Sequence, residues 1–149
     1  MKMFVPQAKR RGMEEFMIKH NIKEGLTATF SKKTTSSDAY LSNDSTFDYL
    51  VSTPAMLNII IGVSAKMLDN LLPIDYVSVG KEVELSHQHP TLVGETVELV
   101  LTVEKVDGDK IYLDIVGKDN HGICLKGKYE RIIVNKNKLN EEAFSRIKL

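Results

Sequence analysis

The chain has 149 residues, with 20 basic and 20 acidic side chains and a pI near 6.9. This length fits one domain with a sizeable core, and the balanced charge gives no support to a nucleic-acid or membrane-surface role. The single cysteine excludes an internal disulfide and a multi-cysteine zinc site. Because the first residues lack the apolar stretch of a signal peptide, we expect a cytoplasmic protein.

The N-terminal residues predict a helical extension of a single domain. Residues 9–20 place Met13, Phe16, Met17 and His20 at helical spacing and carry basic residues at the start. The favoured interpretation is a packing extension, and the alternative is contact with an anionic ligand. We therefore expect an extension over residues 1–21 and one domain over residues 22–149. The segment that follows predicts a strand over residues 26–33 and a short helix around Tyr40.

The most distinctive stretch begins at Thr53-Pro54 and continues as an apolar run over residues 55–65. Thr53 suits the capping position of a helix and Pro54 its first turn. A helix that is apolar on nearly all sides is a buried helix, and this one is too short to cross a membrane. A strand is the alternative, because several residues are β-branched, but length and the Thr-Pro start favour a helix that Pro73 ends.

After Pro73 the apolar residues alternate with period two. The odd-numbered residues of 76–89 are predicted to face the core. Further strands follow over residues 97–103, 111–115 and 123–134, joined at Asp107-Gly108 and around residue 120, with a C-terminal helix capped by Asn140. Strands joined by short antiparallel turns can curl around the central helix, and an open sheet edge favours homodimerisation.

Four segments stand out: residues 50–57 (LVSTPAML), 78–80 (SVG), 86–94 (SHQHPTLVG) and 127–131 (GKYER). Together they resemble segments of the hotdog-fold thioesterases, and within them the fluoroacetyl-CoA thioesterase-like group. Residues 50–57 (LVSTPAML) resemble the family's LATPALV, and residues 78–80 (SVG) with 86–94 (SHQHPTLVG) resemble its SVG and RHLAPTPVG. Residues 127–131 (GKYER) resemble its GTHER. The resemblance covers roughly residues 22–145. It implies an α+β hotdog fold: a curled antiparallel five-stranded sheet around a long central helix, with short N- and C-terminal helices.

The resemblance also implies chemistry on small acyl-CoA thioesters. Thr53 matches the family's active-site threonine, and a helix cap is its alternative role; the two roles need not exclude each other. His87 matches the catalytic histidine and lies on the predicted core face, where a neutral imidazole can serve as a general base. The backbone N–H groups of residues 53–56 are the candidate oxyanion donors, since a helix N-terminus favours developing negative charge.

Further residues are expected to bind substrate. Gly80 matches a family glycine that leaves room beside the acyl group, or else marks a bulge. Arg131 matches the GTHER arginine. The resemblance implies that it contacts the CoA side of the ligand or fixes the site, and the alternative is a surface ion pair. His89 is a reserve candidate, and Asn58 could orient water or a carbonyl group.

The sequence departs from the family pattern at Ile61, where the family carries a glutamate eight residues after its threonine. Isoleucine cannot transfer a proton or orient a histidine. The first interpretation is therefore a dimeric acyl-CoA thioesterase with an altered site, and the alternative is a non-catalytic module that binds an acyl-CoA or another small ligand. A hotdog dehydratase is less favoured, because no paired Asp and His motif is found. We expect no metal, cofactor, nucleic acid or membrane partner.

Overall fold

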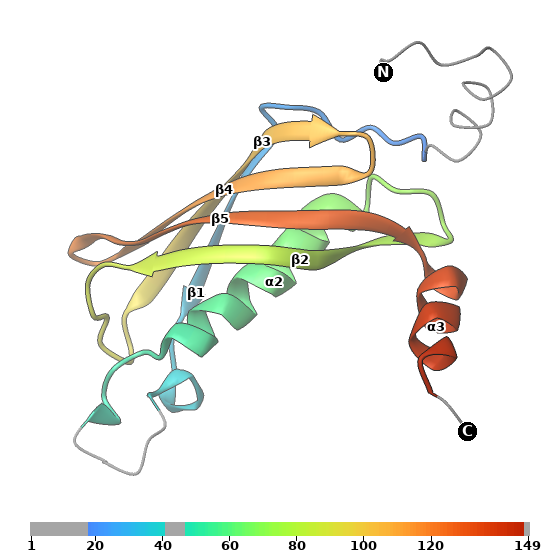
Figure 1. The fold of residues 1–149 in the computed structure, drawn as a ribbon. Helices are drawn as coiled ribbons and strands as arrows, with labels where there is room; N and C mark the ends of the chain where they lie inside the picture. Colours follow the sequence, from blue (N-terminus) through green and yellow to red (C-terminus); the bar gives the residue numbers. More distant parts are fainter. Residues whose placement is uncertain (1–17, 41–46, 148–149) are drawn as a thin grey trace, which may run out of the picture.

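The computed structural model describes residues 18–40 and 47–147. Its strands form one antiparallel sheet in the order β1-β3-β4-β5-β2, and helix α2 lies across one face of that sheet (Figure 1). The elements in chain order are β1 (Thr27–Lys33), the 3-10 helix η1 (Ser36–Asp38), α2 (Thr53–Asp69), β2 (Tyr76–His87), β3 (Thr96–Asp107), β4 (Lys110–Asp119), β5 (Gly122–Asn135) and α3 (Lys136–Ser145). The predicted curled five-stranded sheet around a long helix is confirmed.

Of the three middle strands, β3 and β4 follow the predicted alternation, whereas in β5 the adjacent residues Cys124 and Leu125 are both buried and Ile123 is 41% exposed. Their inward side chains form the core with one face of α2, and the outward side chains are polar or partly exposed. Asp107-Gly108 begins the predicted hairpin, in which Gly108 takes a φ of +62° that favours glycine. The fully buried side chains of these strands include Val97, Leu99, Leu101, Ile111, Leu113, Ile115, Leu125 and Ile133.

In strand β2 the predicted inward face is wrong for part of the strand, because the pairing of β2 with β5 shifts between Gly80 and Glu82. A bulge adds one residue and so exchanges the two faces of a strand. Before the bulge the inward residue is the even-numbered Ser78, which is buried beside Ile133. After the bulge the inward positions are odd-numbered, so the prediction was right only for the part of β2 that ends at His87.

Helix α2 buries one face rather than nearly its whole surface. Met56, Ile60, Ser64 and Leu68 recur every four residues and are all buried. Ile61, on another side of the helix, is 41% exposed. The helix also ends at Asp69, before the predicted stop at Pro73. Among the described residues, no helix is long and apolar enough to cross a membrane.

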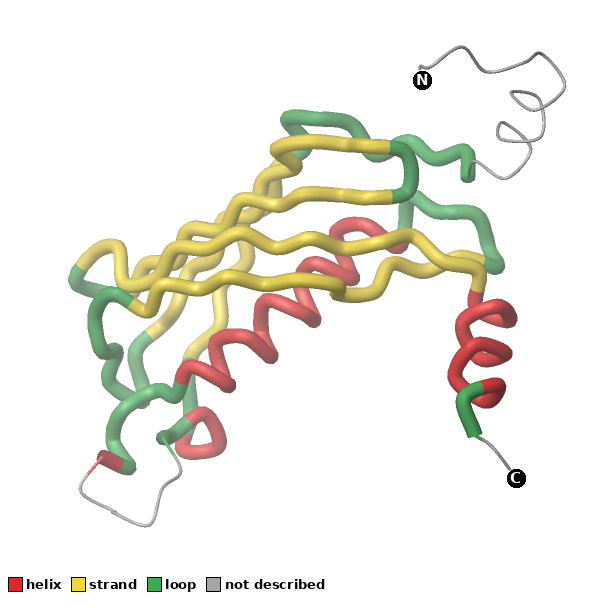
Figure 2. The backbone as a smooth tube through the Cα atoms, in the orientation of Figure 1, coloured by secondary structure: helices red, strands yellow, loops and turns green. Residues whose placement is uncertain are grey.

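The short terminal elements differ from prediction in their positions. The helix expected around Tyr40 is η1, which ends at Asp38. The C-terminal helix α3 starts earlier than expected and is capped by Asn135 instead of Asn140. Figure 2 shows it directly following the last strand. The predicted N-terminal helix lies mostly outside the described residues, and its last three residues, 18–20, are not helical. His20 there bonds the carbonyl of Gly108 through Nε2.

Replacing Gly80 with alanine is expected to destabilise the protein by about 1–3 kcal/mol. A Cβ at this position would lie 2.4 Å from the hydroxyl oxygen of the buried Tyr129 and 3.1 Å from its ring. Urea unfolding measures the effect. Gly62→Ala is the matched control, because a Cβ there meets nothing within 4 Å and alanine suits a helix better than glycine. Equal stability of Gly80→Ala and wild type would contradict the close contact.

Candidate functional site

The two residues predicted to carry chemistry lie together. The hydroxyl oxygen of Thr53, at the first helical position of α2, is 2.8 Å from Nδ1 of His87, at the end of β2. The capping role expected for Thr53 belongs to Ser52, whose hydroxyl accepts a bond from the N–H of Ala55. Since Ser52 caps the helix, Thr53 is free to bond the histidine. Pro54 accordingly occupies the second helical position rather than the first.

The surroundings of His87 favour the neutral imidazole. Burial lowers the pKa of His87 below its ordinary value of 6.5, because desolvation disfavours the charged form. Among the described residues, no carboxylate lies within salt-bridge distance of the ring. The Nε2 atom is buried and has no hydrogen-bond partner within the described part of the chain. The ring thus has one nitrogen held by Thr53 and one that is buried without a partner among the described residues.

Hydrogen bonds within the first turn of α2 lower the number of backbone N–H groups that could donate to an oxyanion. The N–H of Ala55 is taken by Ser52 Oγ, and that of Met56 donates to the Ser52 carbonyl at 3.1 Å. Pro54 has no N–H. Thr53 is therefore the residue of this stretch whose backbone N–H makes no hydrogen bond to another described residue.

Asp38 positions the start of α2, which the sequence alone did not indicate. Its backbone carbonyl accepts a bond from the N–H of Ser52 at 2.9 Å. Its buried carboxylate bonds Lys32 at 2.9 Å and the N–H of Thr35. Burial alone would raise the pKa of Asp38, but these bonds and the charge of Lys32 outweigh it and lower the pKa below its usual value. The backbone carbonyl of Asp38 thus holds Ser52, the residue before Thr53, while the carboxylate fixes Asp38 itself.

Arg131 lies in the core, not at the surface. It is 3% exposed, and its guanidinium donates to Ser78 Oγ, the Ser78 carbonyl, Ser64 Oγ and Tyr129 Oη. Ser78 in turn donates through its hydroxyl to Asp69 at 2.7 Å. The alternative of a surface ion pair is therefore wrong, because the guanidinium is buried. Arg131 instead ties α2, β2 and β5 together.

The other predicted substrate residues are not gathered at the Thr53–His87 pair within one chain. Asn58 is exposed and lines two surface hollows, of about 400 and 330 Å³, that include neither Thr53 nor His87. Ile61 lies eight residues along α2 from Thr53, roughly 12 Å of helix. Gly80 lies seven residues along β2 from His87, roughly 20 Å of strand.

The positions of His89 and Gly80 complete the set of predicted substrate-binding residues. His89 lies past the end of β2 and is exposed, and its backbone N–H donates to the Cys124 carbonyl at 3.2 Å. The room expected above Gly80 is filled by Tyr129, the residue that replaces the histidine of the family's GTHER motif. No group of three or more potential metal ligands occurs among the residues that the structure describes.

A family model described as fluoroacetyl-CoA-specific thioesterase matches residues 34–137. The chain belongs to this family. The match includes Thr53, His87 and Arg131, and therefore every segment on which the resemblance in the sequence rested. No protein with a curated description matches the sequence.

Solved structures agree on the hotdog fold. A hot-dog-like protein from Thermanaerovibrio acidaminovorans is 28% identical, with a TM-score of 0.80 over 85% of this chain and 93% of that one. A thioesterase superfamily member from Thermus thermophilus is 24% identical, with a TM-score of 0.75 and the same coverage. The fluoroacetyl-CoA thioesterase FlK is 16% identical, with a TM-score of 0.79 over 86% and 99%. Structures of FlK variants hold fluoroacetate with CoA, or acetyl-CoA.

Proposed function

We propose that this protein hydrolyses small acyl-CoA thioesters with Thr53 and His87. The observation that carries the proposal is the 2.8 Å bond between Thr53 Oγ1 and His87 Nδ1 at the start of α2. It joins a histidine kept neutral by burial to the hydroxyl of a residue whose backbone N–H has no partner among the described residues. The complexes of FlK variants with CoA and acetyl-CoA support the same class of ligand.

In the proposed reaction the Thr53 hydroxyl accepts a bond from Nδ1–H and so leaves the lone pair on Nε2 of His87. Nε2 takes a proton from a water molecule as the water oxygen attacks the thioester carbonyl carbon. The carbonyl oxygen becomes negatively charged and is stabilised by the N–H of Thr53 and the helix dipole. The C–S bond then breaks and Nε2 returns the proton to sulfur, giving a carboxylic acid and CoA thiol.

The role of Thr53 in this proposal explains how chemistry survives without the family's helix glutamate. A group that holds one ring nitrogen of a histidine fixes which nitrogen carries the proton. A carboxylate also stabilises the imidazolium that forms, whereas a hydroxyl does so only weakly. The protein is therefore expected to be slower than family members that retain the glutamate at the position of Ile61.

We further propose that the acyl pocket is completed by a second copy of the chain. Strand β2 is an edge strand, and residues 80–84 in its middle are exposed. Val83 is 42% exposed beside an open row of backbone groups, which favours pairing with another strand. Two β2 strands paired antiparallel about Val83 place residue 80 of one opposite residue 86 of the other. Gly80 and Ile61 of the partner would then lie beside Thr53 and His87.

The dimer proposal is tested by molar mass in solution with Val83→Lys as the variant. We expect a dimer for wild type and a monomer with at least tenfold lower hydrolysis for the variant, because charges repel across a paired edge. Lys81→Glu, at the bulge of the same strand, is the control that changes charge without placing it on the inward face. A monomeric wild type with full activity would contradict the proposal.

The alternative is a binding module that retains the fold and has lost the reaction, and the substitution of glutamate by Ile61 favours it. Thiol release from short, branched and aromatic acyl-CoAs separates the two. Turnover by wild type supports the enzyme. No turnover by wild type, with activity gained by Ile61→Glu, would mean that the site is intact and hydrolysis has been lost. Ile61→Gln is the matched control, since glutamine has the shape of glutamate without its carboxylate.

A further inference from the structure

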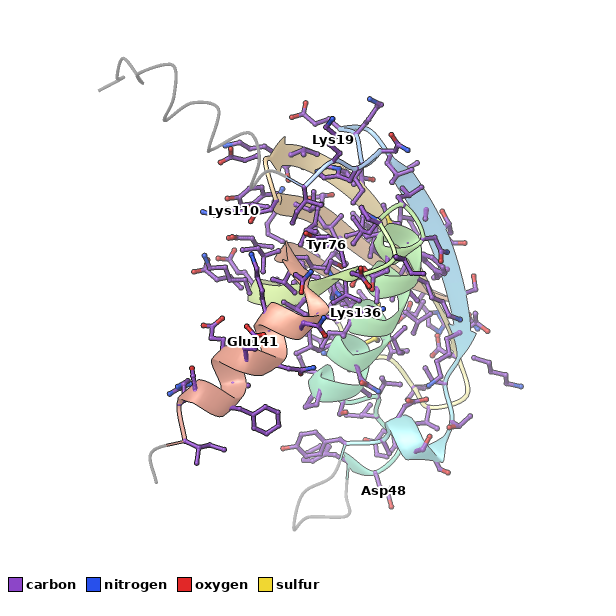
Figure 3. The ribbon with its side chains drawn as sticks, turned by 90° about the vertical axis from the view of Figure 1, so that its right-hand side faces the viewer. Lys19, Asp48, Tyr76, Lys110, Lys136 and Glu141 are labelled. Atoms are coloured by element: carbon purple, nitrogen blue, oxygen red, sulfur yellow. The ribbon has the colours of Figure 1, made fainter. Side chains whose placement is uncertain are left out.

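One loop links the chain segments that carry Thr53 and His87. Residues 88–94 leave β2 directly after His87 and return beside residues 49–51, which lead into α2. The end of β2, the β4–β5 turn and the start of α2 lie at the same end of the molecule (Figure 1). Figure 3 shows Asp48, the residue before this return, at the end that carries η1 and the start of α2.

Thr91 is the buried residue of this loop, whose other residues are exposed or half-buried. Its hydroxyl donates to the carboxylate of Asp119 at the end of β4, with 2.7 Å between the oxygens. Its backbone carbonyl accepts from the N–H of Val51 at 2.8 Å. Val51 is buried as well and lies two residues before Thr53. Thr91 therefore fastens the chain entering α2 to the end of β4.

The carboxylate of Asp119 is held on both oxygens. The second oxygen accepts from the backbone N–H of His121 at 2.8 Å, and this bond fixes the β4–β5 turn. Burial alone would raise the pKa of Asp119, but the bonds from Thr91 and His121 outweigh it and lower the pKa below its usual value. Bonds to an ionised carboxylate are stronger than bonds between neutral groups, so this is a firm attachment for the loop.

The strand that follows the β4–β5 turn holds the other half of the pair. The carbonyl of Cys124 accepts from the N–H of Gln88 at 2.8 Å, directly after His87. His87 itself lies opposite Leu125 in the pairing of β2 with β5. Asp119 thus joins the attachment of α2, through the loop, to the turn from which β5 reaches His87.

We propose that Asp119 is a positioning residue for the Thr53–His87 pair and acts through its bond to Thr91. Without this bond the loop loses its buried attachment, so Val51 and the helix start behind it shift relative to the end of β2. A displacement of about 1 Å breaks a hydrogen bond of 2.8 Å. Misplacement by about 1 Å can also lower a rate on the order of a hundredfold. The kinetic part of this proposal rests on the proposed hydrolysis.

The kinetic test compares two substitutions of Thr91 in the full chain, with acetyl-CoA as substrate. Thr91→Val keeps the shape of the side chain and removes its hydroxyl, and we expect it to lower kcat by roughly ten- to a hundredfold while KM stays within about threefold of wild type. Thr91→Ser keeps the hydroxyl and should retain roughly half of the wild-type kcat or more. Asp119→Ala should match Thr91→Val, and the double variant should be no slower than the slower single variant.

The nitrogen NMR shifts of the His87 ring test the same proposal without turnover. In wild type the bond to Thr53 fixes which ring nitrogen carries the proton, so one tautomer is expected. Thr91→Val and Asp119→Ala should give a mixture of the two tautomers, because the bond is lost. His87→Ala assigns the signals.

Thr27→Val is the matched control, because it also removes one threonine hydroxyl, which donates to the Leu101 carbonyl. Thr27 pairs with Thr102 of β3, which lies roughly 20 Å of strand from Thr96, where β3 begins after the loop. The control should leave kcat and the ring shifts of His87 as in wild type.

Two results would overturn the proposal. In the first, Thr91→Val and Asp119→Ala are folded and match Thr27→Val in kcat and in the ring shifts of His87. In the second, kcat falls while the ring shifts stay unchanged, so that the loss does not pass through the pair. If wild type shows no turnover, the proposed hydrolysis fails and the ring shifts alone support or overturn the positioning role. If Asp119→Ala does not fold, Thr91→Val decides in the same way.

Discussion

His87→Ala is expected to reduce acyl-CoA hydrolysis by two to four orders of magnitude, about the contribution of a positioned general base. The ring lies 2.8 Å from the Thr53 hydroxyl, and its other nitrogen is the buried one without a partner among the described residues. The assay is thiol release at saturating acyl-CoA. His121→Ala is the control, because His121 is an exposed histidine between β4 and β5 that is not among the candidate site residues, and this variant should retain the wild-type rate.

The pH dependence of the same reaction follows from burial of the ring. Burial lowers the pKa of His87 from 6.5, so the neutral base persists to lower pH than it would for an exposed histidine. The rate should therefore fall on the acid side with a midpoint below 6.5 and stay level from there through pH 7 and above. A midpoint above 6.5 would contradict the assignment of His87 as the base, since it would require a group that stabilises the charged ring.

Arg131→Ala is expected to destabilise the protein by about 3–5 kcal/mol, from four lost hydrogen bonds and the space left by the side chain. The acceptors on Ser64, Ser78 and Tyr129 would lose the same donor group. Arg131→Lys should recover only part of the loss, because an ammonium group cannot reproduce the fork of a guanidinium. Chemical unfolding measures both variants.

The same variants distinguish the structural role of Arg131 from a role in CoA binding. Arg131 does not face solvent, so the folded fraction of Arg131→Lys should keep the wild-type KM for acyl-CoA. A KM raised tenfold or more with unchanged stability would instead support direct contact with the ligand. Tyr129→Phe is a useful companion, because it removes one of the four acceptors and should cost about 1 kcal/mol.

The sheet and the central helix could be predicted because each rests on a periodic pattern. The apolar run after Thr53-Pro54 and the alternation in β3 and β4 depend on many residues at once, so local exceptions do not change them. The prediction of the inward face of β2 failed at a single inserted residue, because a bulge of one residue leaves no clear mark in the sequence. The same uncertainty of single positions moved the helix cap from Thr53 to Ser52 and the C-terminal cap from Asn140 to Asn135.

The pairing of Thr53 with His87 could be predicted only through resemblance, because two residues 34 positions apart share no periodic signal. The burial of Arg131 was missed for a related reason. Its partners Ser64 and Ser78 are ordinary polar residues in sequence, and only the fold brings them to one guanidinium. Long-range polar networks of this kind are satisfied by tertiary contacts and leave little trace along the chain.

The most direct test is thiol release from acetyl-CoA by wild type and Thr53→Val, which keeps the shape of the side chain and removes the hydroxyl. Our account predicts measurable turnover by wild type and a loss of at least tenfold in the variant, with unchanged fold, because His87 Nδ1 loses its partner. Turnover by Thr53→Val at the wild-type rate would contradict the account, since the bond between these two residues would then have no part in the reaction.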